Sequence, residues 1–316
     1  MEERRLISVV VPVYREEAVI EQTYAELTAT LAALPSYRYE LLFVDDGSTD
    51  GTSTILGRIA TRDPHVKLIR FSRNFGHQVA ITAGIARARG DAIVTIDADL
   101  QDPPALIPRM LEVWAAGHEI VFARRSEREG ETWFKLATAN AFYRLLNRLA
   151  GIHIPEQTGD FRLIDRRVAD ELNRMPEHNR FVRGLVSWVG FRQATVDYAR
   201  GARRAGETKY PLRKMMRLAW DGIVSFSDRP LRVSMNLGFL AIAVSFGVLA
   251  YGLVQYSRGN TVRGWTSTMV TILFLGGVQL FTLGVIGEYL SRMHDEIKRR
   301  PLYVVAHEIG FEREPP

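Results

Sequence analysis

The chain has 316 residues, of which 47% are hydrophobic and 24% are charged, and it carries a formal net charge of +5 at pH 7. These values are ordinary for a globular protein with one large domain or two smaller ones. Because the chain contains no cysteine, disulfides and thiolate metal sites are excluded. The basic balance suits an anionic partner, which can be nucleic acid, anionic lipid or a phosphorylated substrate.

The N-terminal part of the chain alternates between predicted strands and predicted helices. Short apolar runs predict strands at residues 7–11, 40–44, 66–71, 92–97 and 119–123. Helical spacing and composition predict helices at residues 17–34, 51–62, 79–89 and 104–116. Apolar strands that alternate with helices are typical of a parallel sheet covered on both faces, and such sheets bind ligands at the carboxyl ends of their strands.

Two aspartates, Asp97 and Asp99, stand where the fourth predicted strand ends. Side chains at positions i and i+2 of a strand share a face, so both carboxylates point the same way. Like charges this close repel each other unless a positive group lies between them. Mg²⁺ or Mn²⁺ suits this position, because hard cations take carboxylate oxygens and often share them with substrate phosphates. Taken alone, the pair is also compatible with a strand that ends in a polar loop.

A second acidic pair, Asp45 and Asp46, ends the second predicted strand and is followed by Gly47. Carboxylates accept hydrogen bonds from ribose hydroxyls or a base N–H, and glycine permits a tight turn from strand to helix. An N-capped turn without a ligand is the alternative. Since both acidic pairs follow predicted parallel strands, one cleft can hold them together.

Two stretches without a charged residue, 233–257 and 264–287, mark the C-terminal region. As helices they are long enough to cross about 30 Å of hydrocarbon, and buried core helices rarely run this far without a charge. We therefore predict two membrane spans. Basic residues flank their outer ends at Arg213, Lys214, Arg217, Arg229, Arg232, Arg292, Lys298, Arg299 and Arg300. The connecting loop has only Arg258 and Arg263, so the positive-inside rule predicts both ends in the cytoplasm.

The segment between these regions carries weaker signals. Residues 126–200 are predicted to continue as α+β, with a helix at 133–149, and residues 201–210 form a polar loop. Residues 211–228 combine apolar and basic residues at helical spacing, which is typical of a helix in the membrane interface. A helix packed on its own domain is the alternative.

Eight motifs, in their order along the chain, resemble glycosyltransferase family 2. They are VVVPVYREE (9–17), FVDDGSTDGT (43–52), RNFGHQVAITAGI (73–85), DADLQDPP (97–104), TGDFRLIDR (158–166), RFVRGLVSWVGFRQ (180–193), RRAGETKYPLRKM (203–215) and EIKRRPLYVV (296–305). Within that family, the chain is similar to polyprenyl-phosphate glycosyltransferases, such as bactoprenol glucosyltransferases and dolichyl-phosphate mannose synthases. The resemblance covers nearly the whole chain.

The resemblance implies an α/β fold with four parts. They are a Rossmann-like GT-A nucleotide-sugar-binding domain with a mostly parallel sheet (1–210), an interfacial amphipathic helix (211–232), a transmembrane hairpin (233–290) and a cytoplasmic tail (291–316). It also implies a homo-oligomer in the bacterial inner membrane, with the catalytic domain and both termini in the cytoplasm.

The resemblance also implies roles for individual residues on the donor side. The residues expected around the nucleoside are Pro12, Tyr14, Glu16, Asp45 and Asp46. The residues expected to hold Mg²⁺ or Mn²⁺ with the diphosphate are Asp97, Asp99 and Gln101. One position departs from the family's P-x-Y-N-E pattern, because Arg15 replaces the usual asparagine. The resemblance therefore implies nothing about the detailed contacts that this turn makes.

On the acceptor side, Arg124 and Lys135 match basic positions that hold the acceptor phosphate in similar enzymes. A loop expected to close over both phosphates contains Arg203, Thr208 and Lys209. Asp160 matches a carboxylate near the reacting groups. A phosphate monoester has a second pKa of about 6 and is mostly ionised at neutral pH, so we expect Asp160 to position a substrate rather than remove a proton.

The predicted activity is metal-dependent, inverting transfer of a single hexose, glucose from UDP-glucose, to undecaprenyl phosphate at the cytoplasmic membrane face. The absence of the Q-x-x-R-W motif of processive synthases favours transfer of one sugar. Other donors, GDP-mannose or a UDP-linked aminopentose, remain alternatives, as does a membrane scaffold that binds sugar nucleotides without turnover. We do not expect nucleic acid as a partner, because the basic residues cluster beside the predicted spans.

Overall fold

The computed structural model describes residues 4–127, 155, 158–175, 177–178, 180–199, 229–259 and 264–311. The chain forms two compact units, one from residues 1–148, 152–219 and 301–316 and the other from residues 149–151 and 220–300. The predictions for the helix at 133–149, the loop at 201–210 and the amphipathic helix at 211–228 lie outside the described residues.

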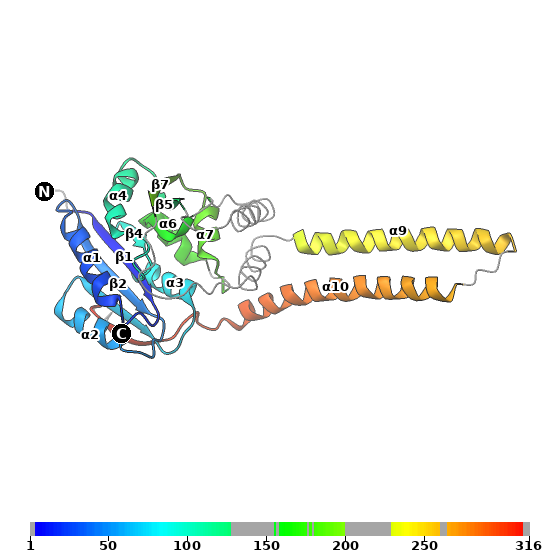
Figure 1. The fold of residues 1–316 in the computed structure, drawn as a ribbon, viewed down its shortest axis with the longest axis horizontal. Helices are drawn as coiled ribbons and strands as arrows, with labels where there is room; N and C mark the ends of the chain where they lie inside the picture. Colours follow the sequence, from blue (N-terminus) through cyan, green and yellow to red (C-terminus); the bar gives the residue numbers. More distant parts are fainter. Residues whose placement is uncertain are drawn as a thin grey trace. The chain divides into compact units, whose positions relative to one another are not determined.

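A single sheet organises the first unit (Figure 1). In the described part of the chain it has eight strands: β1 (Leu6–Val13), β2 (Arg38–Asp45), β3 (Val66–Phe71), β4 (Ala92–Thr95), β5 (Ile120–Glu127), β6 (Thr158–Asp165), β7 (Gln193–Ala199) and β8 (Val305–Ile309). Their spatial order is β7-β5-β6-β4-β1-β2-β3-β8. Strands β1 to β4 are mutually parallel, which confirms the mostly parallel sheet that the sequence predicts.

Strand β6 departs from the simple alternation of strands and helices. The fifth predicted strand, β5, does not pair with β4, because β6 lies between them and is antiparallel to both. Its sequence, TGDFRLID, is almost fully buried although it contains Asp160 and Arg162. This insertion brings polar side chains of β6 next to the carboxyl end of β4.

Helices cover both faces of the sheet (Figure 1). Three of them pack with Val9 and Val11 of β1 in one core: α1 (Ile20–Ala32), α2 (Thr52–Arg62) and α4 (Ile107–Ala115), the last preceded by a short 3₁₀ turn η1 (Pro104–Leu106). The opposite face is covered by α3 (His77–Arg87), α6 (Arg166–Arg174) and α7 (Val182–Trp188). Val10 points to that second face, because side chains alternate along a strand.

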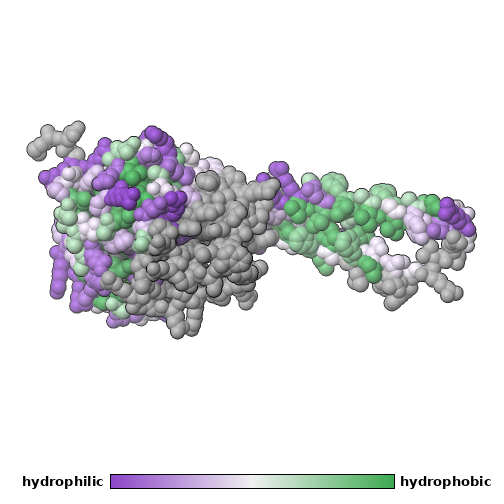
Figure 2. Space-filling view, turned by 45° about the horizontal axis from the view of Figure 1, so that its top comes forward, coloured by the Kyte–Doolittle hydropathy of each residue, from purple (hydrophilic) through white to green (hydrophobic). Residues whose placement is uncertain are grey.

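The second unit contains two long helices, α9 (Arg229–Ser257) and α10 (Trp265–Lys298), that lie side by side (Figure 1). Both are long and apolar enough to cross a membrane. Figure 2 shows hydrophobic residues along both helices and hydrophilic residues near their ends, and large side chains such as Phe246 and Leu280 are exposed. The two predicted apolar helices are therefore confirmed, while their orientation across a membrane stays a prediction.

The segment after α10 returns to the first unit. Strand β8 pairs antiparallel with β3 and forms an edge of the sheet. Residues 291–316 are predicted from the sequence as a cytoplasmic tail, and this strand was not predicted. A five-residue strand has a weak local signal, because its backbone partners come from a segment far away in the sequence.

The contact between α3 and β1 gives a test of the fold. A Cβ on Gly84 would lie 2.1 Å from Val10 Cγ1, and Val10 is fully buried and stiff at χ1. Gly84→Ala is therefore expected to lower the free energy of unfolding by about 1–3 kcal/mol. The measurement is thermal or urea unfolding of the detergent-purified protein.

Gly57→Ala is the matched control for this prediction. Gly57 lies inside α2, where an added Cβ would meet Ile309 Cδ1 at an ordinary 3.8 Å. This change is expected to stabilise the protein by about 0.5–1 kcal/mol, because alanine loses less backbone entropy than glycine in a helix. A Gly84→Ala variant as stable as the wild type would contradict the close packing of α3 on β1.

Candidate functional site

A cavity of about 440 Å³ opens at the carboxyl ends of the central strands. Twelve residues line it: Pro12, Val13, Tyr14, Glu16, Asp46, Asn74, Gly76, His77, Ala80, Asp97, Ala98 and Asp99. They come from the ends of β1, β2 and β4 and from the start of α3. The volume is in the range of small-molecule sites, and the cavity brings together both acidic clusters that the sequence singled out.

Two hydrogen bonds connect the turn after β1 to the turn after β2. The backbone N–H of Arg15 donates to Ser48 Oγ at 3.0 Å, and that of Glu16 donates to Thr52 Oγ1 at 3.0 Å. Arg15 has a φ of 57°, in the left-handed region that asparagine adopts more readily than arginine. An asparagine, as in the family pattern, would suit this backbone, and Arg15 adopts the left-handed conformation here.

Asp46 fixes the loop that leads into α3. Its Oδ1 accepts from the N–H of Phe75 at 2.6 Å, and its Oδ2 accepts from that of Gly76 at 2.9 Å. Burial raises the pKa of Asp46, although these two hydrogen bonds oppose the shift. Gly47 follows with a φ of 70°, and a Cβ there would lie 2.4 Å from the carbonyl carbon of Arg73. The loop and the turn after β2 therefore approach as closely as only glycine allows.

Asp45 has a different environment from that of Asp46. It is fully buried and does not line the cavity. Its Oδ1 accepts from the N–H of Ser48 at 2.9 Å, and its Oδ2 lies 3.7 Å from Nε of Arg70. Asp45 therefore shapes the turn that carries Asp46, rather than facing the cavity itself.

Asp97 and Asp99 both line the cavity. They stand in the turn after β4, which ends at Thr95, and not in the strand whose alternation the sequence argument used. Among the residues that the structure describes, Oδ1 of Asp97 and Oε1 of Gln101 are enclosed and accept no hydrogen bond, although buried acceptors ordinarily do. Burial raises the pKa of Asp97 to about 6; His77 opposes the shift, while the charge of Asp160 adds to it.

Such acceptors fit a divalent cation. Among the described residues, no group of three or more His, Cys, Asp or Glu side chains is arranged to hold a metal. The described residues offer two carboxylates that line the cavity, Asp97 and Asp99. Gln101, whose N–H donates to Asp99 Oδ1 at 3.0 Å, adds a buried amide oxygen that does not itself line the cavity. This set suits Mg²⁺ or Mn²⁺, since Mg²⁺ commonly binds one or two carboxylates and takes its other ligands from water and substrate phosphates.

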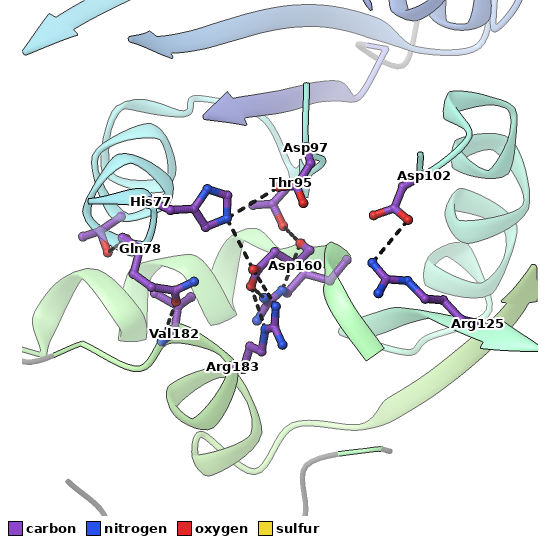
Figure 3. A network of polar contacts seen from close by, with 11 residues as sticks. His77, Gln78, Thr95, Asp97, Asp102, Arg125, Asp160, Val182 and Arg183 are labelled. Atoms are coloured by element: carbon purple, nitrogen blue, oxygen red, sulfur yellow. Dashed lines mark hydrogen bonds and ion pairs between the residues drawn. The ribbon is translucent and has the colours of Figure 1, made fainter. Parts of the chain in front are cut away.

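A network of charged side chains lies beside Asp97 (Figure 3). His77 Nε2 is 3.5 Å from Asp97 Oδ1 and 3.3 Å from Asp160 Oδ2. Arg183 donates to both oxygens of Asp160, from Nε at 3.0 Å and from Nη2 at 2.8 Å. Arg162, which is 1% exposed, also donates to Oδ1 of Asp160. His77 therefore lies between the two carboxylates, and two guanidinium groups hold the second one.

This network sets the protonation of Asp160. Burial alone would raise the pKa of Asp160, but Arg183, the hydrogen bond from His77 and Arg162 hold it well below its usual range. Burial lowers the pKa of Arg162 to about 10, so its guanidinium stays charged at neutral pH. Burial also opposes the charge on His77, yet Asp160 and Asp97 raise its pKa. An ionised carboxylate paired in this way is a weak general base.

The structure separates the predicted site residues into three groups. Six of them line the cavity: Pro12, Tyr14, Glu16, Asp46, Asp97 and Asp99. Three are buried and do not line it: Asp45, Gln101 and Asp160. Arg124 does not line the cavity, because its guanidinium binds the half-exposed carboxylate of Asp197 at 2.6 and 2.9 Å. The predictions for Lys135, Arg203, Thr208 and Lys209 lie outside the described residues.

Three residues of the charged network were not predicted as site residues: His77, Arg162 and Arg183. Arg162 had a signal, because Asp160 and Arg162 stand at positions i and i+2 of a strand and so share a face. The sequence carried no such signal for Arg183, because its contact with Asp160 depends on how α7 lies relative to β6.

The first unit is thus an α/β domain with an acidic cavity at the carboxyl ends of its strands, and the second is an apolar helical hairpin. Residues 8–172 match the model of Glycosyl transferase family 2, and residues 229–293 match that of the GtrB C-terminal hairpin. The chain therefore belongs to glycosyltransferase family 2 and is a glycosyltransferase with a GT-A-like fold.

Relatives of known sequence align over nearly the full length. The uncharacterized glycosyltransferase YkcC of Bacillus subtilis (strain 168) is 53% identical over 96% of this chain and 94% of its own. The bactoprenol glucosyl transferase of Shigella phage SfII is 43% identical over 95% and 97%. A crystal structure of glucosyl-3-phosphoglycerate synthase from Mycobacterium tuberculosis is 22% identical, covers 70% of this chain and 79% of its own, and has a TM-score of 0.46.

The pairing of Asp160 gives a test of the site. Asp160→Asn would leave the buried guanidinium of Arg162 without its counter-charge, so we expect a loss of about 3–5 kcal/mol in the free energy of unfolding at pH 7. The folded pKa of Asp160 is depressed, so this stability is present above the unfolded pKa of about 4 and is lost as the pH falls below it. Unfolding at pH 7 and at acidic pH measures both effects.

Asp197→Asn is the control for this test, because its pair with Arg124 is exposed to solvent. The melting temperature of this variant is expected to equal that of the wild type. If Asp160→Asn were also as stable as the wild type at pH 7, the charged network would not support the fold.

Proposed function

We propose that this protein transfers a single glucose from UDP-glucose to a polyprenyl phosphate. The observation that carries the proposal is the alignment with bactoprenol glucosyl transferases at 43% identity over 95% of this chain and 97% of the relative's own. An alignment of this extent includes both the catalytic unit and the helical hairpin. The cavity and the charged network supply the chemistry that such a transfer requires.

The cavity would receive the donor. Tyr14, which is 40% exposed, and Pro12 give it an apolar wall suited to a base and ribose, and Glu16 adds a hydrogen-bond acceptor. Asp97, Asp99 and Gln101 would hold a divalent cation together with the diphosphate. When bound, that cation would act as a Lewis acid and neutralise negative charge on the departing nucleoside diphosphate.

The acceptor phosphate would act as a nucleophile without a general base. A phosphate monoester has a second pKa of about 6, so its oxygens already carry charge at neutral pH. Asp160 is ionised and bound to Arg162 and Arg183, which suits a positioning role and not proton removal. Attack by the phosphate oxygen on the sugar in a single displacement would invert the anomeric centre.

The hairpin would keep the enzyme beside its lipid substrate, because a long isoprenoid cannot leave the bilayer. Arg229 and Arg232 stand at the start of α9, and Lys298 stands at the end of α10. The positive-inside rule therefore favours cytoplasmic ends and an external connection between the helices. This orientation places the catalytic unit in the compartment that contains nucleotide sugars. An assembly of several copies also remains a prediction.

Incubation of the purified protein with Mn²⁺, undecaprenyl phosphate and labelled sugar nucleotides tests the proposal. UDP-glucose is expected to give a labelled lipid in the organic phase, with inverted anomeric configuration by NMR. GDP-mannose and a UDP-linked aminopentose are the donors of the alternative proposals, and a product from one of these alone would replace glucose. A scaffold that binds nucleotides without turnover would give no labelled lipid from any donor.

Substitution of the acidic pair tests the metal site. Asp97→Asn and Asp99→Asn are each expected to lower kcat by about 100-fold or more, since each removes a charged ligand from the cation that stabilises the leaving group. The measurement is the rate of lipid-linked sugar formation. Asp170→Asn, on the exposed face of α6, is the control and should retain wild-type turnover. Full activity in both cavity variants would refute the proposed metal site.

The pH dependence of Asp160→Asn tests whether Asp160 removes a proton. If Asp160 positions a substrate, the activity lost in the variant should stay lost at every pH between about 7 and 9, because the acceptor phosphate is mostly ionised throughout this range. The measurement is the pH profile of kcat for the wild type and the variant. A variant that is inactive at neutral pH but recovers as the pH rises would instead identify Asp160 as a general base.

A further inference from the structure

The C-terminal segment, residues 301–311, lies outside the cavity but contacts the elements that build one of its walls. Strand β8 runs antiparallel along β3, with Val305 opposite Phe71 and Ile309 opposite Leu68. Just after β3 and just before β8, the N–H of Ser72 donates to the carbonyl of Val304 at 2.9 Å. The segment therefore follows β3 to its carboxyl end, where the loop to α3 begins.

That loop, residues 72–76, is part of the cavity. It contributes Asn74 and Gly76, and His77 at the start of α3 continues the same wall. Residues 72–74 are exposed, so little burial holds them in place. The position of this loop affects both the shape of the cavity and the distance from His77 to Asp97.

An aromatic stack joins the C-terminal segment to this loop. The ring of Tyr303 stacks on that of Phe71, with centroids 4.8 Å apart and an interplanar angle of 21°. Phe71 meets Phe75 edge to face at 5.7 Å. The N–H of Phe75 in turn donates to the carboxylate of Asp46, which lines the cavity. Contacts therefore run without a gap from Tyr303 to the cavity wall.

A second contact holds the element that follows the loop. Glu308 of β8 binds Arg87, at the end of α3, with an N–O distance of 2.6 Å. The guanidinium of Arg87 also lies over the ring of Phe311 at 4.8 Å. The C-terminal segment thus contacts the strand that precedes the loop and the helix that follows it. Arg87 lies at the end of α3 that is remote from the loop, so this contact holds the helix, while the aromatic stack reaches the loop itself through Phe75.

We propose that the C-terminal segment supports the donor site and that Tyr303 is a positioning residue for the loop at 72–76, acting through Phe71 and Phe75. The identity of the ligand rests on the proposed function, but the support of the loop does not. Tyr303 follows Lys298, the last residue of α10, by only five positions. The stretch of chain directly after the second apolar helix is therefore a structural part of the nucleotide site.

The size of the effect follows from the strength of an aromatic pair. Such a pair contributes about 0.5–1.5 kcal/mol beyond its buried area, which corresponds to about a 2- to 10-fold change in an equilibrium constant. Tyr303→Leu removes the stacked ring and keeps apolar bulk. We expect this variant to bind UDP, in the presence of Mn²⁺, about 2- to 10-fold more weakly than the wild type.

Two controls separate the ring from other effects. Tyr303→Phe keeps the stack and is expected to bind UDP as the wild type does. His307→Ala changes an exposed side chain of the same strand and should also leave binding unchanged. The experiment is titration calorimetry of the full-length protein in detergent. Tyr303→Leu with wild-type affinity, or Tyr303→Phe as weak as Tyr303→Leu, would overturn the proposal.

Hydrogen exchange provides a readout that does not depend on the ligand. In Tyr303→Leu, amide exchange is expected to accelerate at residues 72–76 and to stay unchanged in α1, which packs elsewhere in the core. Unchanged exchange in the loop would overturn the proposal. If Tyr303→Leu does not fold, Tyr303→Met takes its place with the same outcomes. A wild-type protein that fails to bind UDP would refute the proposed donor, while hydrogen exchange would still test the support of the loop.

Discussion

The position of His77 between two carboxylates is the constraint on which the rest of the site depends. Asp97 reaches it from the end of β4 and Asp160 from the neighbouring strand β6, at 3.5 and 3.3 Å. A buried carboxylate is costly unless it is paired, and Arg162 and Arg183 meet this need at Asp160. The antiparallel insertion of β6 beside β4 is what allows this arrangement. The departure from a purely parallel sheet therefore builds the functional site.

The two carboxylates differ in what they can do. Asp160 is satisfied by its cations and remains ionised, so its charge is fixed before any substrate arrives. Among the described residues, Oδ1 of Asp97 accepts no hydrogen bond and has His77 at 3.5 Å, and burial raises the pKa of Asp97 to about 6. We propose that Asp160 orients the site while Asp97 receives a cation. Such a division of roles suits a transferase in which charge develops on a departing diphosphate.

Much of the sheet and of the acidic cavity could be predicted from the sequence, because these features depend on local patterns. The parallel strands β1 to β4 are continuous apolar runs, and the acidic residues at their ends follow from turn chemistry. Long-range pairing left no comparable signal: β6 lies between β4 and β5, Arg183 approaches from α7, and β8 closes an edge of the sheet. Arg124 was predicted to hold the acceptor phosphate, and its pair with Asp197 could not be predicted because the partner lies on another strand. The acceptor role of Arg124 stays a prediction. Sequence patterns specify which face of a strand is buried, but not which distant segment covers it.

Asp97 and Asp99 are proposed to hold a divalent cation together with the nucleotide. Titration of Mn²⁺ followed by electron paramagnetic resonance, with and without UDP, measures this directly. We predict one tight Mn²⁺ per chain in the presence of UDP, much weaker binding without UDP, and loss of the tight site in Asp97→Asn. Tight binding that survives in Asp97→Asn, or the absence of any UDP-dependent site in the wild type, would contradict the claim.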